Sequence, residues 1–462
     1  MERKQTTNLL QGASIARDAV KNIFPAMAAM VMVLIYNLAD TFFIGQTRQD
    51  ILVAAVSLAT PVFLVLMAIG NLFGVGGTSL ISRSLGQGRT AYAKKVCSFC
   101  MWSCVGVGVI LAALALLFIN PILALIGASA DTWAPTQTYL SIVFLGGPFV
   151  LISNCYSNIL RAEGQASKAM MGQVVGNLLN IILDPIMISV FGWGIAGAAI
   201  ATVIGNIMGA GYYILYFLRG SSLLSIRLRD FSMKEKICAR VLAIGVPSAL
   251  ASLLMSVSQM IVNARMAAYG DMAVAGIGVA MKVTMISSMI CMGVGQGVQP
   301  LLGFCVGAGT WERFKKIIRF SLWFAFALSA AMTLLCYLLS DQIVGVFLTE
   351  TSAFDYAVEF AHILLTTSVL FGVFFVLVNA LQAMGAAAEA LIVSMSRQGI
   401  IYIPALFLLQ ALLNASGLVW AQPVADVLST CLVIVLYCRA LSRMQKASQN
   451  AASLAARREN SL

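Results

Sequence analysis

Two aspartates lie inside otherwise apolar stretches of this sequence. Asp40 falls near the end of the apolar run 22–45, and Asp184 falls within the run 169–191. A carboxylate is costly to bury in an apolar medium, so an ionisable residue in such a run marks a functional site by default. Two carboxylates near each other could share a proton or hold a cation between them.

Polar side chains accompany both aspartates at a similar depth. If the runs are helices, Tyr36 lies one turn from Asp40, and Asn180 lies one turn from Asp184. With a rise of about 1.5 Å per residue, Asp40 lies roughly 8 Å, Asp184 roughly 10 Å and Thr202 roughly 12 Å from the nearer end of its run. Three separate helices would therefore bring polar side chains to one level.

Three interpretations of this cluster are open. A carboxyl pair could take up a proton on one side of a membrane and release it on the other. A dehydrated sodium ion could instead be coordinated by oxygens of Asp40, Asn180, Asp184 and Thr202. In the structural alternative, Asp184 with Pro185 marks a helix kink, and Asp40 caps a helix near the surface.

The composition places these residues in a membrane protein. Of 462 residues, 60% are hydrophobic and 10% are charged, whereas soluble domains have about 45–50% apolar and about 25% charged residues. A hydrocarbon core about 30 Å thick is crossed by roughly 20 apolar residues of helix. We therefore predict an all-α polytopic membrane protein with twelve transmembrane helices, at 22–45, 52–82, 96–118, 133–157, 169–191, 194–218, 241–268, 272–305, 318–338, 357–382, 390–412 and 416–438.

Basic residues alternate between the loops that join these runs. Of the 29 lysines and arginines, 25 fall in the two tails and in every second loop, and Arg48 is the only basic residue of the other loops. Cytoplasmic loops carry the excess of lysine and arginine, which places both termini in the cytoplasm. The net charge of +11 is then a topology signal, with anionic membrane lipids rather than nucleic acid as the partner.

Residues for other kinds of chemistry are scarce. His362 is the only histidine and the ten cysteines are scattered, so neither multi-histidine metal catalysis nor a disulfide framework nor a structural zinc site is indicated. The sequence contains no HExxH motif and no nucleophile elbow. We therefore expect neither an enzyme nor a bound cofactor.

The chain carries an internal duplication. A shift of 221 residues pairs Gly86 with Gly307 and Asn158 with Asn379, among other like residues. Six runs per half is an even number, so both halves enter the membrane with the same polarity, as in transporters built from parallel repeats. We predict two six-helix lobes related by a pseudo-two-fold axis, at 1–218 and 241–438, joined by a basic cytoplasmic linker (219–240) and followed by a basic cytoplasmic tail (439–462).

Several motifs resemble those of one transporter family. The first run contains Pro25 and then Tyr36-Asn37-Leu38-Ala39-Asp40-Thr41, a later loop reads Arg161-Ala162-Glu163-Gly164, and the fifth run contains Asn177-x-x-Asn180-x-x-x-Asp184-Pro185. Together with the glycine-rich second and eighth runs, they resemble the multidrug and toxic compound extrusion (MATE) family, in order along nearly the whole chain. The string Ala-Asp-Thr-Phe-Phe-Ile-Gly is most similar to the MepA-like bacterial subgroup.

The resemblance implies an antiporter of the bacterial inner membrane. It would export lipophilic cationic or amphipathic compounds in exchange for H⁺ or Na⁺ by alternating access, and we expect a monomer with membrane lipids as its other partner. A flippase for a lipid-linked precursor is the alternative, but its cleft would be expected to be rich in arginine and lysine, whereas the N-terminal lobe is acidic. The candidate coupling-ion or substrate site comprises Tyr36, Asp40, Asn158, Asn180, Asp184 and Thr202.

We assign a structural role to the charged residues of the C-terminal lobe. Lys282, Glu359, Arg397 and Asp426 fall within or near the apolar runs, where they are possible polar sites but more simply form ion pairs within the bundle. Some NorM-type relatives carry an acidic residue on the seventh helix. The stretch Pro247–Gly270 contains none, so that site cannot be transferred to this chain.

The loop charges predict which residues face the cytoplasm. Cysteines introduced at Lys94, Lys234 and Lys446 should resist membrane-impermeant thiol reagents in intact cells, whereas a cysteine at Asp131 should react. The parent chain, with its native cysteines, sets the background. Labelling of the Lys234 position from outside would overturn the orientation.

Overall fold

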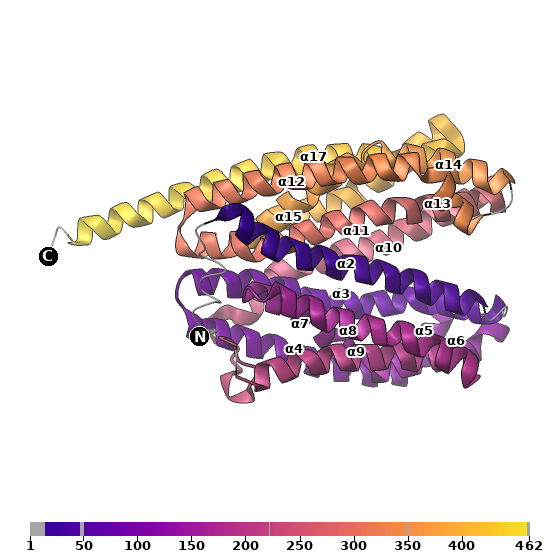
Figure 1. Ribbon diagram of the computed structural model, residues 1–462, viewed down its shortest axis with the longest axis horizontal. Helices are drawn as coiled ribbons and strands as arrows, with labels where there is room; N and C mark the ends of the chain where they lie inside the picture. The colour runs from indigo at the N-terminus through magenta and orange to yellow at the C-terminus, as the bar shows by residue number, and fades with distance from the viewer. Residues whose placement is uncertain (1–13, 47–49, 221, 349–350, 460–462) are drawn as a thin grey trace. The chain divides into compact units, whose positions relative to one another are not determined.

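The computed structural model describes residues 14–46, 50–220, 222–348 and 351–459. The regular elements in these ranges are all helices (Figure 1). The first thirteen residues and Arg48, which contribute to the charge pattern of the sequence, lie outside the described ranges. The chain divides into two compact units.

Unit 1 contains residues 21–81 and 90–256 of the described chain. Most of its helices are long and apolar, and two short 3-10 turns, Leu228–Asp230 and Lys234–Lys236, lie in the connection before α10. Its helices are α2 (Ile15–Gln46), α3 (Asp50–Gly86), α4 (Thr90–Leu117), α5 (Ile119–Leu125), α6 (Ala130–Leu145), α7 (Gly147–Ala162), α8 (Ala166–Pro185), the π-helix η1 (Ile186–Val190), α9 (Gly194–Leu218) and the first part of α10 (Ile237–Met266).

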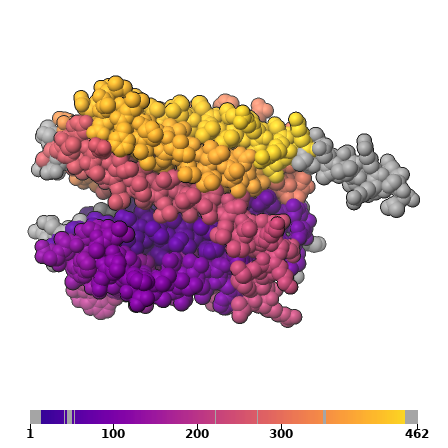
Figure 2. All heavy atoms as spheres, turned by 180° about the vertical axis from the view of Figure 1, so that it is seen from behind, coloured from indigo at the N-terminus to yellow at the C-terminus, as the bar shows by residue number. Residues whose placement is uncertain are grey.

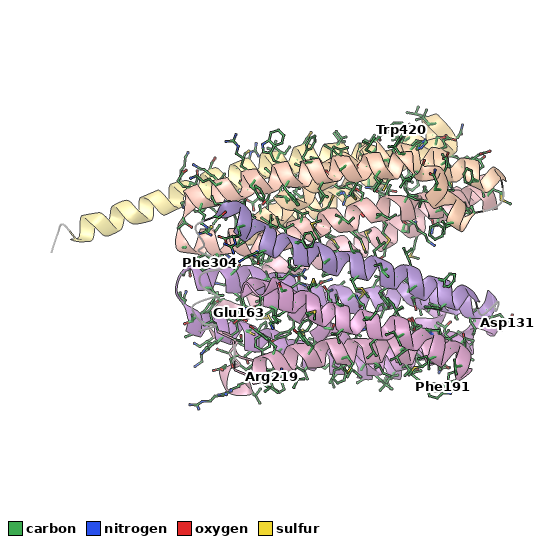
Figure 3. The ribbon with its side chains drawn as sticks, viewed as in Figure 1. Asp131, Glu163, Phe191, Arg219, Phe304 and Trp420 are labelled. Atoms are coloured by element: carbon green, nitrogen blue, oxygen red, sulfur yellow. The ribbon has the colours of Figure 1, made fainter. Side chains whose placement is uncertain are left out.

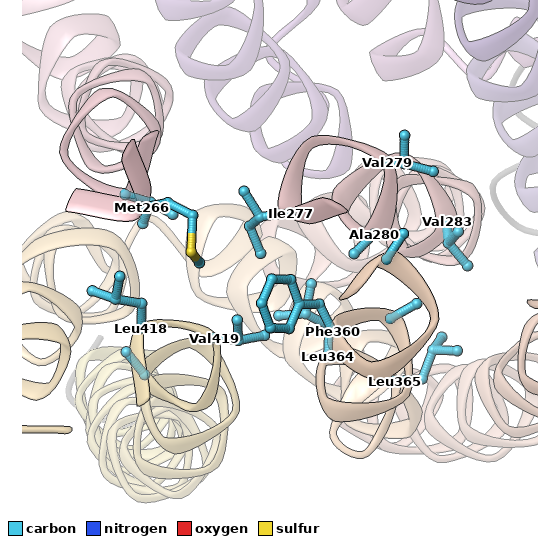
Figure 4. Packing of buried hydrophobic residues seen from close by; sticks show 14 of the residues in the cluster. Met266, Ile277, Val279, Ala280, Val283, Phe360, Leu364, Leu365, Leu418 and Val419 are labelled. Carbon is cyan, nitrogen blue, oxygen red and sulfur yellow. The ribbon is translucent and has the colours of Figure 1, made fainter. Parts of the chain in front are cut away.

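Unit 2 contains residues 257–348 and 351–459 of the described chain, together with the short segments 14–20 and 82–89. Buried apolar side chains from α10, α11, α14 and α17 form its core, and Figure 4 shows Phe360 and Leu364 between Ile277 and Val419. Its elements are η4 (Ala267–Tyr269), α11 (Asp271–Ala308), α12 (Trp311–Leu338), α13 (Ser340–Phe347), α14 (Thr351–Leu365), η5 (Ser368–Leu370), α15 (Phe371–Met384), α16 (Ala387–Met395), the π-helix η6 (Ser396–Ile400) and α17 (Tyr402–Glu459).

The predicted number of membrane spans is confirmed. Nine helices of the described chain are long and apolar enough to cross a membrane, and two bent pairs, α6 with α7 and α14 with α15, raise the number to eleven. The stretch 387–446 counts as one of the nine, but its helix is interrupted at Asn414, whose φ is 56°. Since this break separates the two last apolar runs, the total is twelve.

The surface of the bundle is apolar, as a lipid environment requires. Leu408, Leu412 and Leu428 on α17 are exposed, Leu412 to 69%. Figure 2 shows α17, in yellow, at the surface of unit 2. Apolar side chains that cover the outside of long helices are typical of a multi-pass membrane protein, because lipid tails replace water around them.

The loops of unit 1 gather at its two ends. Figure 3 places Glu163 and Arg219 near one end of this unit and Asp131 and Phe191 near the other. Residues from even-numbered and odd-numbered predicted loops therefore lie at opposite ends. This arrangement is the one that a bundle of membrane-crossing helices requires.

Two glycines let α8 and α9 touch. A Cβ atom on Gly176 would lie 2.7 Å from the Gly205 carbonyl oxygen, and one on Gly205 would lie 2.7 Å from the Gly176 carbonyl oxygen. Glycine at both positions is typical of close helix crossings in membranes. The crossing matters for the site, because Asn180 and Thr202 lie about one turn away on the two helices.

One added methyl group at the crossing should push α8 and α9 apart. In Gly205→Ala the new Cβ overlaps the Gly176 carbonyl oxygen, so we expect a loss of about 1–3 kcal/mol, as in other overpacked cores. Thermal melting of the purified protein measures this loss. Gly211→Ala is the matched control on the same helix, since a Cβ there meets nothing within 4 Å. Equal melting temperatures for the two variants would contradict the close crossing.

Candidate functional site

The centre of the candidate site is a hydrogen-bonded group on α8 and α9. With the Asn180 amide oriented to satisfy both of its ends, its Nδ2 donates to Asp184 Oδ2 at 3.2 Å. Its Oδ1 then accepts from the backbone N–H of Thr202 at 3.0 Å. Asn180 therefore joins the carboxylate of α8 to α9, directly beside the glycine crossing.

Two further helices of unit 1 bring acidic and phenolic groups to this centre. Asp40 on α2 interacts electrostatically with Asp184. Tyr36 on α2 and Tyr139 on α6 both interact with the Thr202 side chain and with the two aspartates. Tyr139 was not among the residues predicted from the sequence, because nothing in the run 133–157 distinguishes the face of α6 that turns toward the aspartates.

Neither aspartate has a basic partner within the described ranges. Asp184 is fully buried, and its Oδ1 makes no hydrogen bond within the described chain. None of the ion pairs found among the described residues involves Asp40 or Asp184. A buried carboxylate without a counter-ion is stable only when it is protonated or holds a cation. The pair is therefore suited to exchange a small cation with its surroundings.

The oxygens present could bind a proton or a sodium ion. The described residues contain no group of three or more histidine, cysteine, aspartate or glutamate side chains placed to hold a metal ion. The available donors are two carboxylates, the Asn180 amide and the Thr202 hydroxyl. Such a mixed oxygen set matches the ligands that sodium receives in transporters, so both coupling ions are compatible with it.

A polar cavity adjoins the aspartates within unit 1. It is open on one side, and Tyr36, Asn180 and Thr202 contribute to its wall. None of its lining residues carries a charge, and the apolar part of the wall includes Phe63 and Met67. The rest of the polar wall is formed by Ser153, Asn154, Gln173, Asn177 and Asn206.

Comparison with known proteins identifies the family. The MatE family profile matches residues 25–186 and again 247–408, which also confirms the internal duplication. This chain belongs to the MATE family. It is 32% identical to the multidrug export protein MepA of Staphylococcus aureus (strain MRSA252) over 402 residues, which cover 87% of this chain and 89% of that protein.

A second relative and a solved structure agree with this assignment. The multidrug export protein MepA of Staphylococcus saprophyticus is 31% identical over 414 residues, covering 90% of this chain and 91% of that protein. Within the MATE family the chain is therefore MepA-like. A multidrug resistance MATE family transporter of the MOP superfamily, solved in an outward-facing conformation, superimposes with a TM-score of 0.90 at 24% identity, over 95% of this chain and 98% of that one.

Asn158 belongs to a different network of this MATE chain. Its Nδ2 donates to Asn71 Oδ1 at 3.3 Å, and its Oδ1 accepts from Arg161 at 3.1 Å. These partners lie toward the end of α7 that carries Glu163. The structure thus brings Tyr36, Asp40, Asn180, Asp184 and Thr202 together and joins Asn158 to other groups.

The charged residues of unit 2 have separate surroundings. Arg397 and Asp426 form an ion pair at 2.8 Å, and Glu359 accepts a hydrogen bond from Ser416 at 3.1 Å. Lys282 lies over the ring of Phe347, 4.8 Å from its centre. Only Arg397 and Asp426 are therefore paired with each other.

Glu163 is a buried carboxylate whose role sequence reasoning missed. It follows α7 directly, is fully buried and accepts hydrogen bonds from Ser222 Oγ, at 2.8 and 2.9 Å, and from the Leu223 N–H. It therefore anchors the segment that connects α9 to α10. Burial raises the pKa of Glu163 to about 7, although these hydrogen bonds oppose the rise. The only signal in the sequence was the family-like Arg161-Ala162-Glu163-Gly164 loop.

Attachment of this segment to Glu163 should weaken as the pH rises from about 4.5 to 7. Because the pKa of Glu163 is about 7 when buried and 4.5 when free, the attached state binds the proton more tightly. Its stability is full below pH 4.5 and falls by on the order of 3 kcal/mol as Glu163 ionises. Hydrogen-exchange protection of the Leu223 and Leu224 amides, corrected for intrinsic exchange, should therefore fall between about pH 4.5 and pH 7 and then level off above pH 7.

Two variants show whether Glu163 causes this effect. Glu163→Gln stays neutral, so its protection should not depend on pH across this range. Glu235→Gln removes an exposed carboxylate of the same connection, which pairs with Lys95 at 3.4 Å, and should behave as the parent chain does. A pH dependence that persists in Glu163→Gln would contradict the assignment.

Proposed function

We propose that this chain is a multidrug efflux antiporter that exports lipophilic cations in exchange for H⁺ or Na⁺. One observation carries the proposal: Asp40 and Asp184 interact across two helices, have no basic partner in the described chain, and adjoin an uncharged polar cavity. The names of the MepA relatives support export as the direction of transport.

Competition for the two carboxylates would couple the fluxes. When the pair is ionised, it attracts a cationic compound into the adjoining cavity. When it holds a proton or sodium ion, that attraction is lost and the compound is released. Binding of the two ligands is then negatively linked, and by thermodynamic reciprocity each weakens the other. Alternating access follows if the two occupancies favour opposite orientations of the cavity.

The residues of the cavity wall are evidence for varied organic cations as substrates. Its amides can accept or donate hydrogen bonds to many ligand shapes. Met67 and Phe63 provide polarizable apolar contact, and methionine adapts to irregular partners. A lipid-linked diphosphate would need arginine or lysine in the wall, and the lining has neither. The cavity thus favours the antiporter over the flippase.

The remaining parts of the proposal concern the setting of the protein. We place it in the bacterial inner membrane with both termini in the cytoplasm, because that orientation puts most basic residues on the cytoplasmic side. Anionic lipids are the partners of those residues. We further propose that it works as a monomer, without a cofactor, and that it transports rather than catalyses.

Removal of either aspartate should uncouple transport from the ion gradient. Asp40→Asn and Asp184→Asn preserve side-chain volume but cannot ionise, so the pair can no longer exchange its ion. We expect ethidium efflux in proteoliposomes to fall at least about tenfold, which corresponds to about 1.4 kcal/mol. Imposing the proton and sodium gradients separately identifies the coupling ion.

A matched variant in the other unit serves as the control. Glu359→Gln removes a carboxylate that is exposed and bonded to Ser416, and it should transport as the parent chain does. Near-normal gradient-driven efflux by both aspartate variants would refute the proposed coupling site. If the protein transports anionic lipid-linked compounds but not ethidium, the antiporter proposal is wrong and the flippase alternative is supported.

A further inference from the structure

Unit 2 contains a carboxylate that already holds a cation of the chain itself. Asp426 on α17 is 2% exposed, and its Oδ1 accepts from Arg397 Nε at 2.8 Å and from Gln422 Nε2 at 2.9 Å. Thr367 Oγ1 donates to Oδ2 at 3.4 Å. Asp426 lies roughly 18 Å along its helix from the end of the last span, which is near the middle of the membrane.

An aromatic wall faces the same guanidinium. Phe371, Phe374 and Phe375 project from neighbouring positions on consecutive turns of α15. The guanidinium carbon of Arg397 lies 5.0, 4.8 and 5.4 Å from the centres of their rings. A cation within about 6 Å of a ring centre is attracted by the ring's quadrupole. Aromatic faces combined with one carboxylate are the chemistry that recognises an organic cation.

The duplication pairs this arrangement with the glycine crossing of unit 1. The 221-residue shift pairs Arg397 with Gly176 and Asp426 with Gly205. In unit 1 those glycines touch and line the cavity. In unit 2 the same two positions carry the guanidinium and its carboxylate. The two halves therefore differ at equivalent positions. In unit 1 the glycines leave space beside the helix crossing, and in unit 2 the charged side chains fill that space.

We propose that Asp426, Phe371, Phe374 and Phe375 form a binding site for an organic cation, of guanidinium or quaternary ammonium type, which the chain fills with Arg397. We call it the C-terminal cation site. Arg397 acts there as a tethered ligand. Because it belongs to the same chain, its effective concentration at the site is high, and a free cation must compete with it. A diffusible cation is therefore excluded from the C-terminal cation site while Arg397 is in place and binds there when Arg397 is removed.

Chemical rescue tests the proposal on the full-length purified protein without any ion gradient. Arg397→Ala should melt several degrees below the parent chain, because Asp426 loses its counter-ion. Millimolar guanidinium should restore most of that loss, and tetramethylammonium should restore part of it. Urea, which has a similar shape but no charge, should restore none. The parent chain should not respond to either cation at these concentrations.

Two variants separate binding at this site from a general salt effect. Arg397→Ala combined with Asp426→Asn removes the carboxylate, so guanidinium should not stabilise it. Lys282→Ala removes a cation that stacks on Phe347 and has no carboxylate partner among the described residues, and it should also not respond. Absence of rescue in Arg397→Ala, or equal rescue in the double variant, would overturn the proposal.

The test remains decisive if Arg397→Ala aggregates on extraction from the membrane. The comparison is then made by gel filtration of extracts prepared with and without guanidinium. A monodisperse peak only with guanidinium supports the site, and aggregation under both conditions overturns it. The outcome does not depend on the proposed antiport, since Asp40→Asn in unit 1 should leave guanidinium rescue unchanged.

Discussion

An unbalanced charge is the most costly feature that a helix bundle in lipid can contain, and most buried charges of this chain are balanced locally. Asp426 has Arg397 at 2.8 Å, and Glu163 has the Ser222 hydroxyl and the Leu223 N–H. Asp40 and Asp184 differ, because the described chain supplies no cation for them. In the proposed function, their charge is balanced by an ion that arrives from outside. Tyr36 and Tyr139, the hydrogen bonds of Asn180 and the glycine crossing of α8 and α9 surround these two aspartates beside a cavity.

The duplicated halves have diverged at equivalent positions. Gly176 and Gly205 let two helices touch in unit 1, and the residues 221 positions later are Arg397 and Asp426, an ion pair on an aromatic wall. In an ion pair the two charges neutralise each other, so the pair attracts a free cation only weakly. An unpaired carboxylate does the opposite. The two halves thus carry different chemistry at these positions: a close helix crossing in unit 1 and an ion pair in unit 2.

Much of the fold and part of the site could be predicted from the sequence. Helices that cross a bilayer share one axis, so residue number converts directly to depth, and Asp40, Asp184 and Thr202 could be placed at one level. Depth does not determine how a helix is rotated, so Tyr139 could not be found and Asn158 was grouped with residues it does not contact. The burial of Glu163 could not be predicted, because it depends on a connecting segment about 60 residues later, which hydropathy does not reveal. The break at Asn414 was placed correctly, since the apolar pattern itself stops there.

Infrared difference spectroscopy on the purified protein tests most directly whether Asp40 and Asp184 form one coupled site. The C=O band of protonated carboxyl groups is followed while the pH is changed, in the parent chain, in Asp40→Asn and in Asp184→Asn. Two interacting carboxyls titrate as a pair, so removal of one should shift the pH at which the other binds its proton. The two single-variant curves should then fail to add up to the curve of the parent chain. Curves that do add up would show two independent carboxyls and contradict the account.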